Sequence, residues 1–405
     1  MASKKRQKIR EQDVEGLKYF ARLHPLLRRL HDVGCDRDRA GNRTLHYDEY
    51  CMLALLFLFN PVVSSLRALQ QASELKKVQR KLNCPRASLG SLSEATQVFD
   101  PERLVEIIEE LSLELQPVVH DPRLRDLKQT LIAVDGSLLK RLPQITQASF
   151  SAQIGGPAPD GWRLHTQFEV LRGVPRRSDL TNARNSGESN EKTVLRKHLQ
   201  PDCCYVTDRG YEQFSLFNEI VDAHSSYVCR VKNDHHFEAT ETRPLSDDAK
   251  AAGVLSDSIG KMGSPKSRRI EHPHHAVRLI TIKVEIHPKR GGKKSNAATK
   301  DLVIATNLLD VPPEVIALIY QYRWTIEIFF RFFKHILGCR HLLSQKQEGI
   351  EIQTYCAIIA CLLISLWTGR KPTLRTYEMI CYYFTGLADE EELQAHISKL
   401  PPADA

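Results

Sequence analysis

Hydrophobic positions along this chain follow two patterns, and together they predict a protein of mixed α/β class. Short apolar or β-branched runs bounded by polar residues are typical of buried strands. Such runs occur at residues 131–134, 163–171, 174–180, 205–208, 226–231, 277–286 and 302–305. Apolar residues at helical spacing occupy 191–199 and 214–220. The middle of the chain is therefore predicted to run strand, strand, strand, helix, strand.

The same patterns divide the chain into five segments. They are a helical N-terminal domain, the first part of an α/β core, a β-rich insertion, the second part of the core and a tail, at residues 1–125, 126–232, 233–310, 311–370 and 371–405. In the first segment an apolar run at 52–59 ends at Asn60 and Pro61. A later helix is predicted to start at Asp100 and Pro101, which suit an N-cap and the first helical position.

The most informative pattern lies at residues 320–334. In a helix, with roughly 100° per residue, four polar side chains fall within an arc of about 60°. They are Tyr320, Arg323, Glu327 and Lys334. Apolar residues cover much of the remaining circumference: Ile326, Phe329, Phe330, Phe333 and Leu337. One interpretation is a surface row of ion pairs, and the other is a polar face that belongs to a functional site.

Two aspartates upstream favour a functional site. Asp135 follows the apolar run 131–134, and Asp208 follows the run that begins at Tyr205. A single aspartate at the end of a strand is commonly a turn residue or a helix cap. Three carboxylates that converge with Glu327 repel one another unless a cation joins them, and ligand sets made only of oxygen suit Mg²⁺ or Mn²⁺. Two such ions, about 3.5–4 Å apart, support phosphoryl transfer.

Cationic and aromatic residues near this triad are candidates for contacts with nucleic acid. Arg323 and Lys334 suit phosphate binding, since arginine binds phosphate through a two-pronged fork. Tyr320 could donate a hydrogen bond to a phosphate or stack on a nucleotide. Arg209 and Arg331 are further candidates. Trp324 could stack on a base, or it could belong to the core.

The spacing Tyr-x2-Arg-x3-Glu-x6-Lys of residues 320–334 resembles the signature of one branch of the DDE superfamily of insertion-sequence transposases. The Asp-Gly-Ser context of Asp135 resembles that of the first aspartate of the family. The stretch Thr-Asp-Arg-Gly-Tyr around Asp208 resembles the second. This resemblance covers about residues 125–370 and implies a ribonuclease H-like core, a mixed sheet flanked by helices and, in some relatives, interrupted by a β-rich segment.

The resemblance also implies an activity. The implied activity is metal-dependent cleavage of DNA at transposon ends, followed by transfer of the freed 3′ hydroxyl to target DNA. The resemblance implies that Asp135, Asp208 and Glu327 are the catalytic residues and the ligands of two Mg²⁺ or Mn²⁺ ions. The implied partners are double-stranded DNA, as terminal inverted repeats and target, and a second copy of the chain in a homodimer. Some relatives flip a base with an aromatic residue from the insertion and form a hairpin. The tryptophans here are Trp162, Trp324 and Trp367, all outside 233–310, so the hairpin route is left open.

Charge is consistent with a DNA partner. The net charge is +8, with a pI near 8.9. Basic residues gather in an N-terminal arm and in the insertion, at Lys4, Lys5, Arg6, Lys8, Arg10, Lys266, Arg268, Arg269, Lys289, Arg290, Lys293, Lys294 and Lys300. They predict either a track for the DNA backbone or solvated loops. Residues 1–125 could likewise hold a helix-turn-helix reader of transposon ends or a helical module that packs on the core.

Other features limit the alternatives. The ten cysteines include no Cys-x2-Cys pair, which argues against a zinc ribbon and favours reduced core thiols. The histidines at 235–236 and 272–275 are interpreted as loop residues. The N-terminus is charged, and the apolar stretch 355–367 is short for a membrane span, so we expect a cytoplasmic, nucleoid-associated protein without a membrane partner. Two other functions stay open, a related nuclease without strand transfer and a non-catalytic DNA-binding protein.

Overall fold

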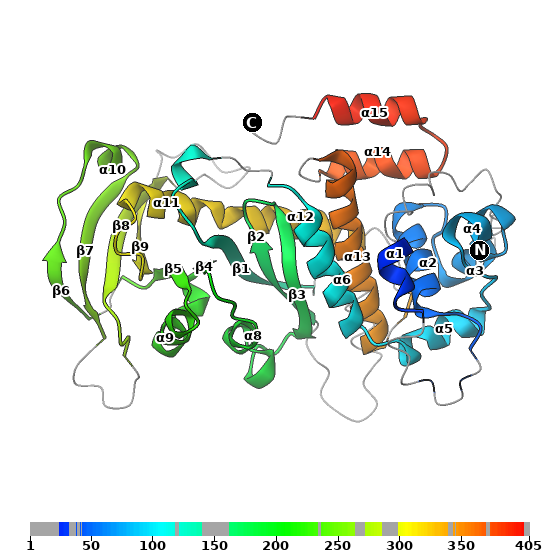
Figure 1. Cartoon of the computed structure of the whole chain (residues 1–405), viewed down its shortest axis with the longest axis horizontal. Coiled ribbons are helices and arrows are strands. Elements are labelled where there is room, and N and C mark those ends of the chain that lie inside the picture. The colour runs from blue at the N-terminus through cyan, green and yellow to red at the C-terminus, as the bar shows by residue number, and fades with distance from the viewer. Residues whose placement is uncertain are drawn as a thin grey trace, which may run out of the picture.

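A mixed nine-stranded sheet forms one half of the molecule, and helices form the other half (Figure 1). The structure is a computed structural model, and it describes residues 24–31, 38, 41, 43–117, 121–139, 162–233, 236–263, 272–285, 299–338, 343–344, 346–369 and 373–400. The strand order is β3-β2-β1-β4-β5-β9-β8-β7-β6. This arrangement confirms the mixed α/β class with a sheet flanked by helices.

The first five strands correspond to the predicted core. Their bounds are β1 Thr130–Leu138, β2 Trp162–Glu169, β3 Val174–Asn182, β4 Cys203–Thr207 and β5 Ser226–Val231. Strands β1, β4 and β5 are parallel, and their apolar residues are buried on both faces, as the continuous hydrophobic runs indicated. Strands β2 and β3 form a hairpin whose turn contains Gly173 with φ of 70°, a conformation that glycine adopts without strain.

Strand β1 differs from the prediction at its end. The run was expected to stop before Asp135, but β1 continues to Leu138 because β2 keeps pairing with it, with Asp135 opposite Thr166. On its other edge, the last pair of β1 with β4 joins Ala133 and Val206. Asp135 therefore lies inside a strand, at the point where one of the two neighbouring strands has ended.

The β-rich insertion extends the core sheet. It contains β6 Phe237–Thr242, α10 Asp247–Ala251, β7 Val254–Met262, β8 Val277–Glu285 and β9 Thr299–Thr306. The last of these strands, β9, pairs antiparallel with β5, so that Val228 lies opposite Thr306. Most of the basic cluster expected here, at residues 264–271 and 286–298, lies outside the described residues.

A buried ion pair anchors this extension to the core. Arg278 of β8 is 1% exposed and binds Asp257 of β7 through two hydrogen bonds, of 2.8 and 2.7 Å. Its remaining donor group reaches the carbonyl oxygens of Leu308 and Leu309, at 3.0 and 3.1 Å, and that of Val311. These carbonyls belong to the segment that leads from β9 into the next helix, so the pair fixes where that helix begins.

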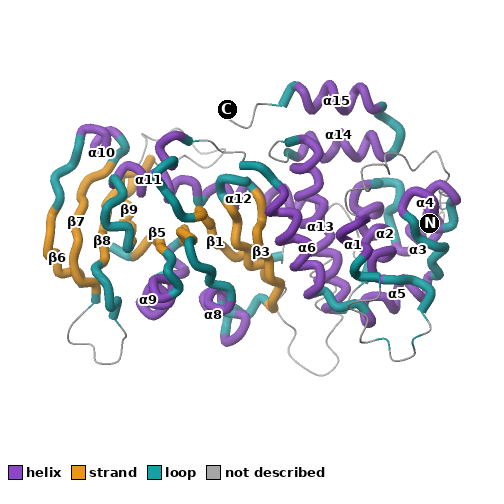
Figure 2. Tube along the Cα trace, in the orientation of Figure 1, coloured by secondary structure: helices purple, strands orange, loops and turns teal. Residues whose placement is uncertain are grey.

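Alternate residues of β1 point to two separate hydrophobic clusters. Leu131 and Ala133 face α11 Pro313–Tyr322, α12 Trp324–Gly338 and α13 Gln347–Thr368. Ile132 and Val134 face α8 Glu191–Lys197 and α9 Phe214–Asp222. Figure 2 shows α11 and α12 in line along the sheet and α8 and α9 apart from them. Because side chains alternate along a strand, Asp135 faces the α12 side and Gly136 faces the α8 side.

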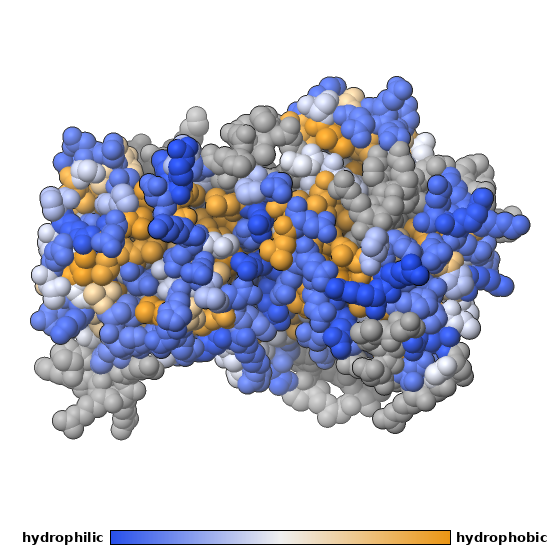
Figure 3. All heavy atoms as spheres, viewed as in Figure 1, coloured by the Kyte–Doolittle hydropathy of each residue, from blue (hydrophilic) through white to orange (hydrophobic). Residues whose placement is uncertain are grey.

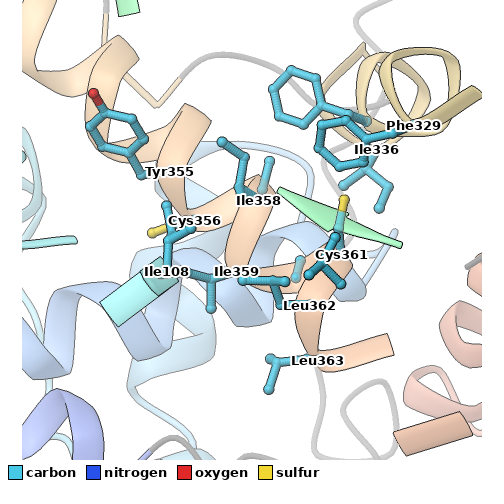
Figure 4. Close-up of a cluster of buried hydrophobic side chains, with 14 of the residues drawn as sticks. Ile108, Phe329, Ile336, Tyr355, Cys356, Ile358, Ile359, Cys361, Leu362 and Leu363 are labelled. Carbon is cyan, nitrogen blue, oxygen red and sulfur yellow. The ribbon is translucent and has the colours of Figure 1, made fainter. Parts of the chain in front are cut away.

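The N-terminal helices share the larger cluster. They are α1 His24–Arg28, α2 Tyr47–Phe59, α3 Leu66–Ser73, α4 Lys76–Leu82, α5 Leu89–Val98 and α6 Glu102–Glu114. All residues of α2 are buried. Helix α6 lies next to β3, and α13 contacts both α6 and α2 (Figure 1). Figure 4 shows labelled side chains of α13 between Tyr355 and Leu363 together with Ile108 of α6 and Phe329 and Ile336 of α12.

Helix α13 is the one described helix that is long and apolar enough to cross a membrane by length and composition. However, 89% of its most apolar window is buried inside the protein, as is usual for a core helix.

The face drawn in Figure 3 is largely hydrophilic, with hydrophobic atoms visible in patches between the elements.

The helices differ from the sequence prediction at three places. Residues 88–93 were expected to precede a helix, but they begin α5, where the side chain of Ser88 accepts a hydrogen bond from the backbone of Ser91. The tail at 371–405 contains two helices, α14 Leu374–Phe384 and α15 Glu390–Ser398. Residues 320–334 form two helices with a junction at Arg323, which keeps αR angles of φ −52° and ψ −32°.

Candidate functional site

Asp135 and Asp208 lie side by side at one edge of the parallel part of the sheet. The last register pair of β1 and β4 is Ala133 with Val206, and each aspartate follows its member of that pair by two residues. Asp208 caps the short 3-10 helix η5 Arg209–Tyr211, since its Oδ1 accepts a hydrogen bond from Gly210 at 2.7 Å. Ligand sites of α/β sheets collect at such carboxyl ends.

Arg323 joins Glu327 to this edge. Its Nη2 donates to Glu327 Oε1 at 2.8 Å, and its Nη1 lies 3.6 Å from Asp135 Oδ2. Arg323 has αR backbone angles, so the helical repeat continues across the junction of α11 and α12. Arg323 and Glu327, four residues apart, therefore lie on the same face, as predicted. The structure thus brings Asp135, Arg323 and Glu327 together.

Tyr320 takes a different place from the one expected. It is 9% exposed, and burial raises the pKa of its hydroxyl. Its ring lies under the guanidinium of Arg323, with 6.0 Å between Cζ and the ring centroid, a cation–π contact. The residue expected on the exposed polar face therefore supports Arg323 from within the core, and its predicted contact with DNA stays a prediction.

A groove of about 500 Å³ opens beside Asp135 and Glu327. Its lining consists of Asp135, Gly136, Ser137, Trp324, Glu327, Phe330, Arg331 and Lys334. Trp324 is 54% exposed, which decides between the two interpretations of this residue in favour of an accessible ring. Arg331 is exposed one turn beyond Glu327, and Lys334 is half-buried. Arg209 is exposed beside Asp208 and does not line the groove.

The carboxylates influence one another. Burial raises the pKa of Asp135 to about 6. The guanidinium of Arg323 opposes this rise, while the negative charges of Asp208 and Glu191 add to it. A site that gathers negative charge in this way favours a cation, and its donors are all oxygen atoms, which suits a hard divalent ion.

The spacing of the side chains limits how a cation could be held. Among the described residues, no group of three histidine, cysteine, aspartate or glutamate side chains lies close enough to hold a metal ion. Arg323 lies between Asp135 and Glu327. Magnesium, however, usually keeps several waters and binds one or two carboxylates together with substrate phosphates. Asp135 and Asp208 therefore fit such an ion, and Glu327 joins them if Arg323 turns toward a phosphate.

Two charged residues in this region were missed by the sequence patterns. Glu191, the first residue of α8, forms an ion pair with Arg163 of β2, whose Nη1 donates to Glu191 Oε1. The side chains are 15% and 14% exposed. His165, two residues from Arg163, is a buried neutral residue, since burial and then the charge of Arg163 lower its pKa to about 4. Helical spacing located α8 but could not indicate which residue its first carboxylate would meet.

The remaining candidates are structural or lie outside the described residues. His274 pairs with Asp222 at 3.1 Å, and His275 lies 3.0 Å from the hydroxyl of Tyr227. The cysteines that the structure describes are buried and form no disulfide with one another. The N-terminal basic arm at residues 4–10 and His235 fall outside the described part of the chain, whereas Lys300 is exposed on β9.

Comparison with known proteins places this site in a family. The family described as Transposase DDE domain matches residues 126–363, from the start of the sheet to α13. The chain belongs to the transposase DDE domain family. Asp135, Asp208 and Glu327 all lie within the matched residues.

The chain is similar to curated proteins named as putative or probable transposases, two of them for insertion sequence elements. A putative transposase of Sinorhizobium fredii is 23% identical over 207 residues, which is 51% of this chain and 53% of that protein. A probable transposase for insertion sequence element IS5377 of Geobacillus stearothermophilus is 24% identical over 206 residues, 50% of this chain and 48% of that one. A putative transposase for an insertion sequence element of Synechocystis is 41% identical over 165 residues, 40% of each chain.

The chain thus spans about half the length, or less, of the curated relatives it matches. Among solved structures there is a distant likeness to a piggyBac transposase in a synaptic complex with hairpin DNA. It has a TM-score of 0.38 and 11% identity and covers 95% of this chain and 84% of that one.

Proposed function

We propose that this member of the transposase DDE domain family cleaves DNA at the ends of a transposable element and joins the freed 3′ hydroxyl to target DNA. The observation that carries the proposal is the meeting of Asp135 and Asp208 at adjacent strand ends, with Arg323 linking Asp135 to Glu327. The finer assignments, a ribonuclease H-like core and the branch with the Tyr-Arg-Glu-Lys signature, belong to the same proposal.

In this proposal Asp135, Asp208 and Glu327 hold two Mg²⁺ ions, which Mn²⁺ can replace. When bound, these ions supply activation of the attacking oxygen and stabilisation of the leaving one. The protein contributes a fixed edge of sheet that sets the spacing of the two aspartates. It also contributes Arg323, which can exchange its contact with Asp135 for a contact with phosphate.

The residues of the groove bind and orient the DNA strand. Arg331 and Lys334 line the groove near Glu327 and neutralise phosphates, as Arg323 does beside Asp135. The exposed ring of Trp324 stacks on a base at the strand end. Arg209 contacts the backbone on the side of Asp208, and Tyr320 keeps the guanidinium of Arg323 in place.

The chemistry is balanced without a nucleotide cofactor. In the first step the oxygen of water bonds to phosphorus, the P–O3′ bond breaks, and a 3′ hydroxyl and a 5′ phosphate result. In the second step that 3′ oxygen bonds to a target phosphorus and the target 3′ oxygen leaves with a proton. Each bond formed replaces one broken, so positioning and electrostatic stabilisation supply the catalysis.

Partners and location follow from this function. The substrates are double-stranded terminal inverted repeats and target DNA, and two copies of the chain hold the two ends together. The N-terminal helices, residues 1–125, are assigned to end binding. We propose that the protein acts in the cytoplasm, on the nucleoid, without a membrane partner.

The test combines purified protein, Mg²⁺, DNA fragments that carry the inverted repeats flanking the coding sequence, and a target plasmid. We expect cut ends and joined products from the wild type. Asp135→Ala, Asp208→Ala and Glu327→Ala should each abolish cleavage and leave end binding intact. Cuts without joined products would identify a nuclease instead, and unchanged behaviour of Asp135→Ala would identify a non-catalytic DNA-binding protein.

A further inference from the structure

Glu191 lies against both aspartate segments of the site. A Cβ atom on Gly136 would be 2.5 Å from Glu191 Oε1, and one on Gly210 would be 3.8 Å from Glu191 Oε2. Gly136 directly follows Asp135, and Gly210 follows Asp208 by two residues. The absence of side chains at these two glycines thus leaves room for a single carboxylate, which approaches from the α8 face of the sheet, opposite to the face of Glu327.

The position of Glu191 is fixed by its surroundings. Arg163 donates to Oε1, and the backbone N–H of Glu191 donates to Asn185 Oδ1 at 3.0 Å. Asn185 adopts a left-handed conformation with φ of 54°, and its carbonyl accepts a hydrogen bond of 3.2 Å from Asn190 Nδ2. Asparagine is one of the few residues that tolerate this conformation. A dedicated turn therefore starts α8 with its first carboxylate directed at the site.

Tyr211 provides an independent indication that this cluster has a ligand. Its side chain is 1% exposed, and its hydroxyl has no hydrogen-bond partner among the described residues. Tyr211 directly follows Gly210, and its ring belongs to the cluster that contains Val134 of β1 and Leu195 of α8, so its side chain lies on the face of the sheet from which Glu191 approaches. An unpaired buried hydroxyl costs roughly 1–3 kcal/mol. A donor left in this state on the Glu191 side of the sheet indicates that a bound group completes the cluster.

A purely structural role for Glu191 explains less. In the structural pair of Asp257 with Arg278, both carboxylate oxygens accept from the arginine. Glu191 instead keeps Oε2 on the side of Gly210, where a Cβ atom would lie 3.8 Å from Glu191 Oε2 and 2.9 Å from Asp208 Oδ1. Moreover, Nε of Arg163 is buried without a partner among the described residues. Placing a further negative charge here is unfavourable unless a cation compensates for it.

We propose that Glu191 is a fourth carboxylate of the cation site, which acts with Asp135 and Asp208 to hold one divalent ion together with its coordinated waters from the α8 face, since no three of these side chains lie close enough to bind the ion by themselves. Arg163 positions the carboxylate of Glu191, and the hydroxyl of Tyr211 is the nearby hydrogen-bond donor. This inference rests on the proposed function, since it concerns the same cation site. A site made only of Asp135, Asp208 and Glu327 would bind the cation equally well without Glu191. The present inference predicts instead that the affinity for the cation depends on Glu191.

The experiment measures Mn²⁺ binding to the full chain without DNA, from the electron paramagnetic resonance signal of free Mn²⁺. Glu191→Gln keeps the shape and one acceptor for Arg163, and we expect it to weaken Mn²⁺ binding about 10-fold to 100-fold. The matched control is Glu188→Gln, three residues earlier, whose side chain is 83% exposed and pairs with Lys197. It should bind Mn²⁺ as the wild type does.

Changes at Arg163 separate a ligand from an ion-pair partner. Arg163→Gln removes a positive charge beside Glu191 but keeps an N–H donor that can hold its carboxylate in place, so it should leave Mn²⁺ binding as tight or tighter. The double variant Arg163→Gln/Glu191→Gln removes both charges and, because it leaves no charge unpaired, keeps the fold testable by its thermal transition. We expect it to bind Mn²⁺ as weakly as Glu191→Gln alone.

The outcomes distinguish this inference from the proposed function. Wild-type affinity in Glu191→Gln, or its recovery in the double variant, would overturn the role of Glu191 while leaving the triad intact. Binding of Mn²⁺ that is lost in Asp135→Asn but kept in Glu191→Gln would likewise exclude Glu191 as a ligand. If the wild type and Asp135→Asn both fail to bind Mn²⁺, the cation part of the proposed function fails, and this inference fails with it.

Discussion

Two arginine–carboxylate pairs in this molecule have similar chemistry and different surroundings. Arg278 and Asp257 are fully buried, share two hydrogen bonds, and use the remaining arginine donors on backbone carbonyls. Arg163 and Glu191 lie nearer the surface and share a single hydrogen bond, with further carboxylates close by. The charges of Arg278 and Asp257 balance each other within the pair. Around Arg163 and Glu191, the additional carboxylates leave an excess of negative charge.

The difference separates structural from functional charge. In a buried ion pair whose donors and acceptors all have partners within the protein, the two side chains hold segments of the fold together and have no group left to bind a ligand. A cluster in which carboxylates raise the pKa of one another is kept at a cost to folding and is typical of binding sites. Substitutions in the two regions should therefore have different consequences for activity and for stability.

The largest effect is expected at Asp135. Asp135→Asn removes a charge that the proposed cations require, and cleavage of end DNA should fall at least about ten-thousandfold, more than about 5 kcal/mol of transition-state stabilisation. Gel assays of cut ends with Mg²⁺ measure this loss, and gel-shift assays check that end binding persists. Glu188→Gln is the control. Cleavage within tenfold of the wild type would place Asp135 outside the site.

Loss of the structural pair should instead reduce stability. Arg278→Met leaves Asp257 charged and buried, and we expect the free energy of unfolding to fall by about 3–5 kcal/mol. Chemical denaturation measures the change. Arg278→Met/Asp257→Leu should recover much of the loss, because it leaves no buried charge. By contrast, Arg163→Gln should cost less than half as much as Arg278→Met; an equal cost would remove the distinction between the two pairs.

A third prediction concerns pH. The pKa of Asp135 is raised by burial to about 6, so the folded protein binds a proton more tightly than the unfolded chain. This contribution to stability is present below about pH 4 and is lost as pH rises through about 6. In EDTA at pH 7, Asp135→Asn should therefore be more stable than the wild type by about 1–3 kcal/mol.

Denaturation curves recorded from pH 4.5 to pH 8 test this sign. The advantage of Asp135→Asn should shrink as the pH falls, since the wild-type carboxyl then takes up its proton. A constant difference between the two proteins across this range would contradict the assignment. The same substitution is thus expected to remove activity and add stability, whereas Arg278→Met is expected to reduce stability.

The smallest effect is expected at Trp324. Trp324→Ala should weaken binding of DNA with a single-stranded end by about 1–3 kcal/mol, the usual contribution of stacking. Ile328→Ala is the matched control, because Ile328 is similarly exposed on α12 but does not line the groove. Fluorescence anisotropy with labelled DNA measures both. Equal losses in the two variants would assign the effect to the helix surface rather than to the ring.

Local patterns predicted most of the sheet and the polar face of α12. The apolar runs located β1 to β5, and the spacing of Arg323 and Glu327 was preserved because helical periodicity is a local property. The family match is consistent with these motifs. The roles of individual site residues remain predictions that the proposed substitutions address.

Features that depend on distant partners were not predictable. Glu191 meets Arg163, 28 residues earlier in the sequence, and no periodicity records that contact. The extension of β1 beyond Asp135 depends on pairing with β2, which a single strand does not encode. Tyr320 was assigned to the exposed side because helical phase gives a direction, whereas burial depends on what packs there. The helix α14 was missed even though Tyr377, Ile380 and Phe384 have helical spacing.

The exposure of Trp324 has a practical consequence for spectroscopy. Trp162 is 7% exposed and Trp367 is half-buried, so the part of the tryptophan emission that comes from a solvated indole arises mainly in the groove. Quenching by iodide, an anion drawn to the nearby Arg331 and Lys334, should reach this ring first. The wild-type chain thus carries an intrinsic optical probe that reports, without any label, when a strand enters the groove.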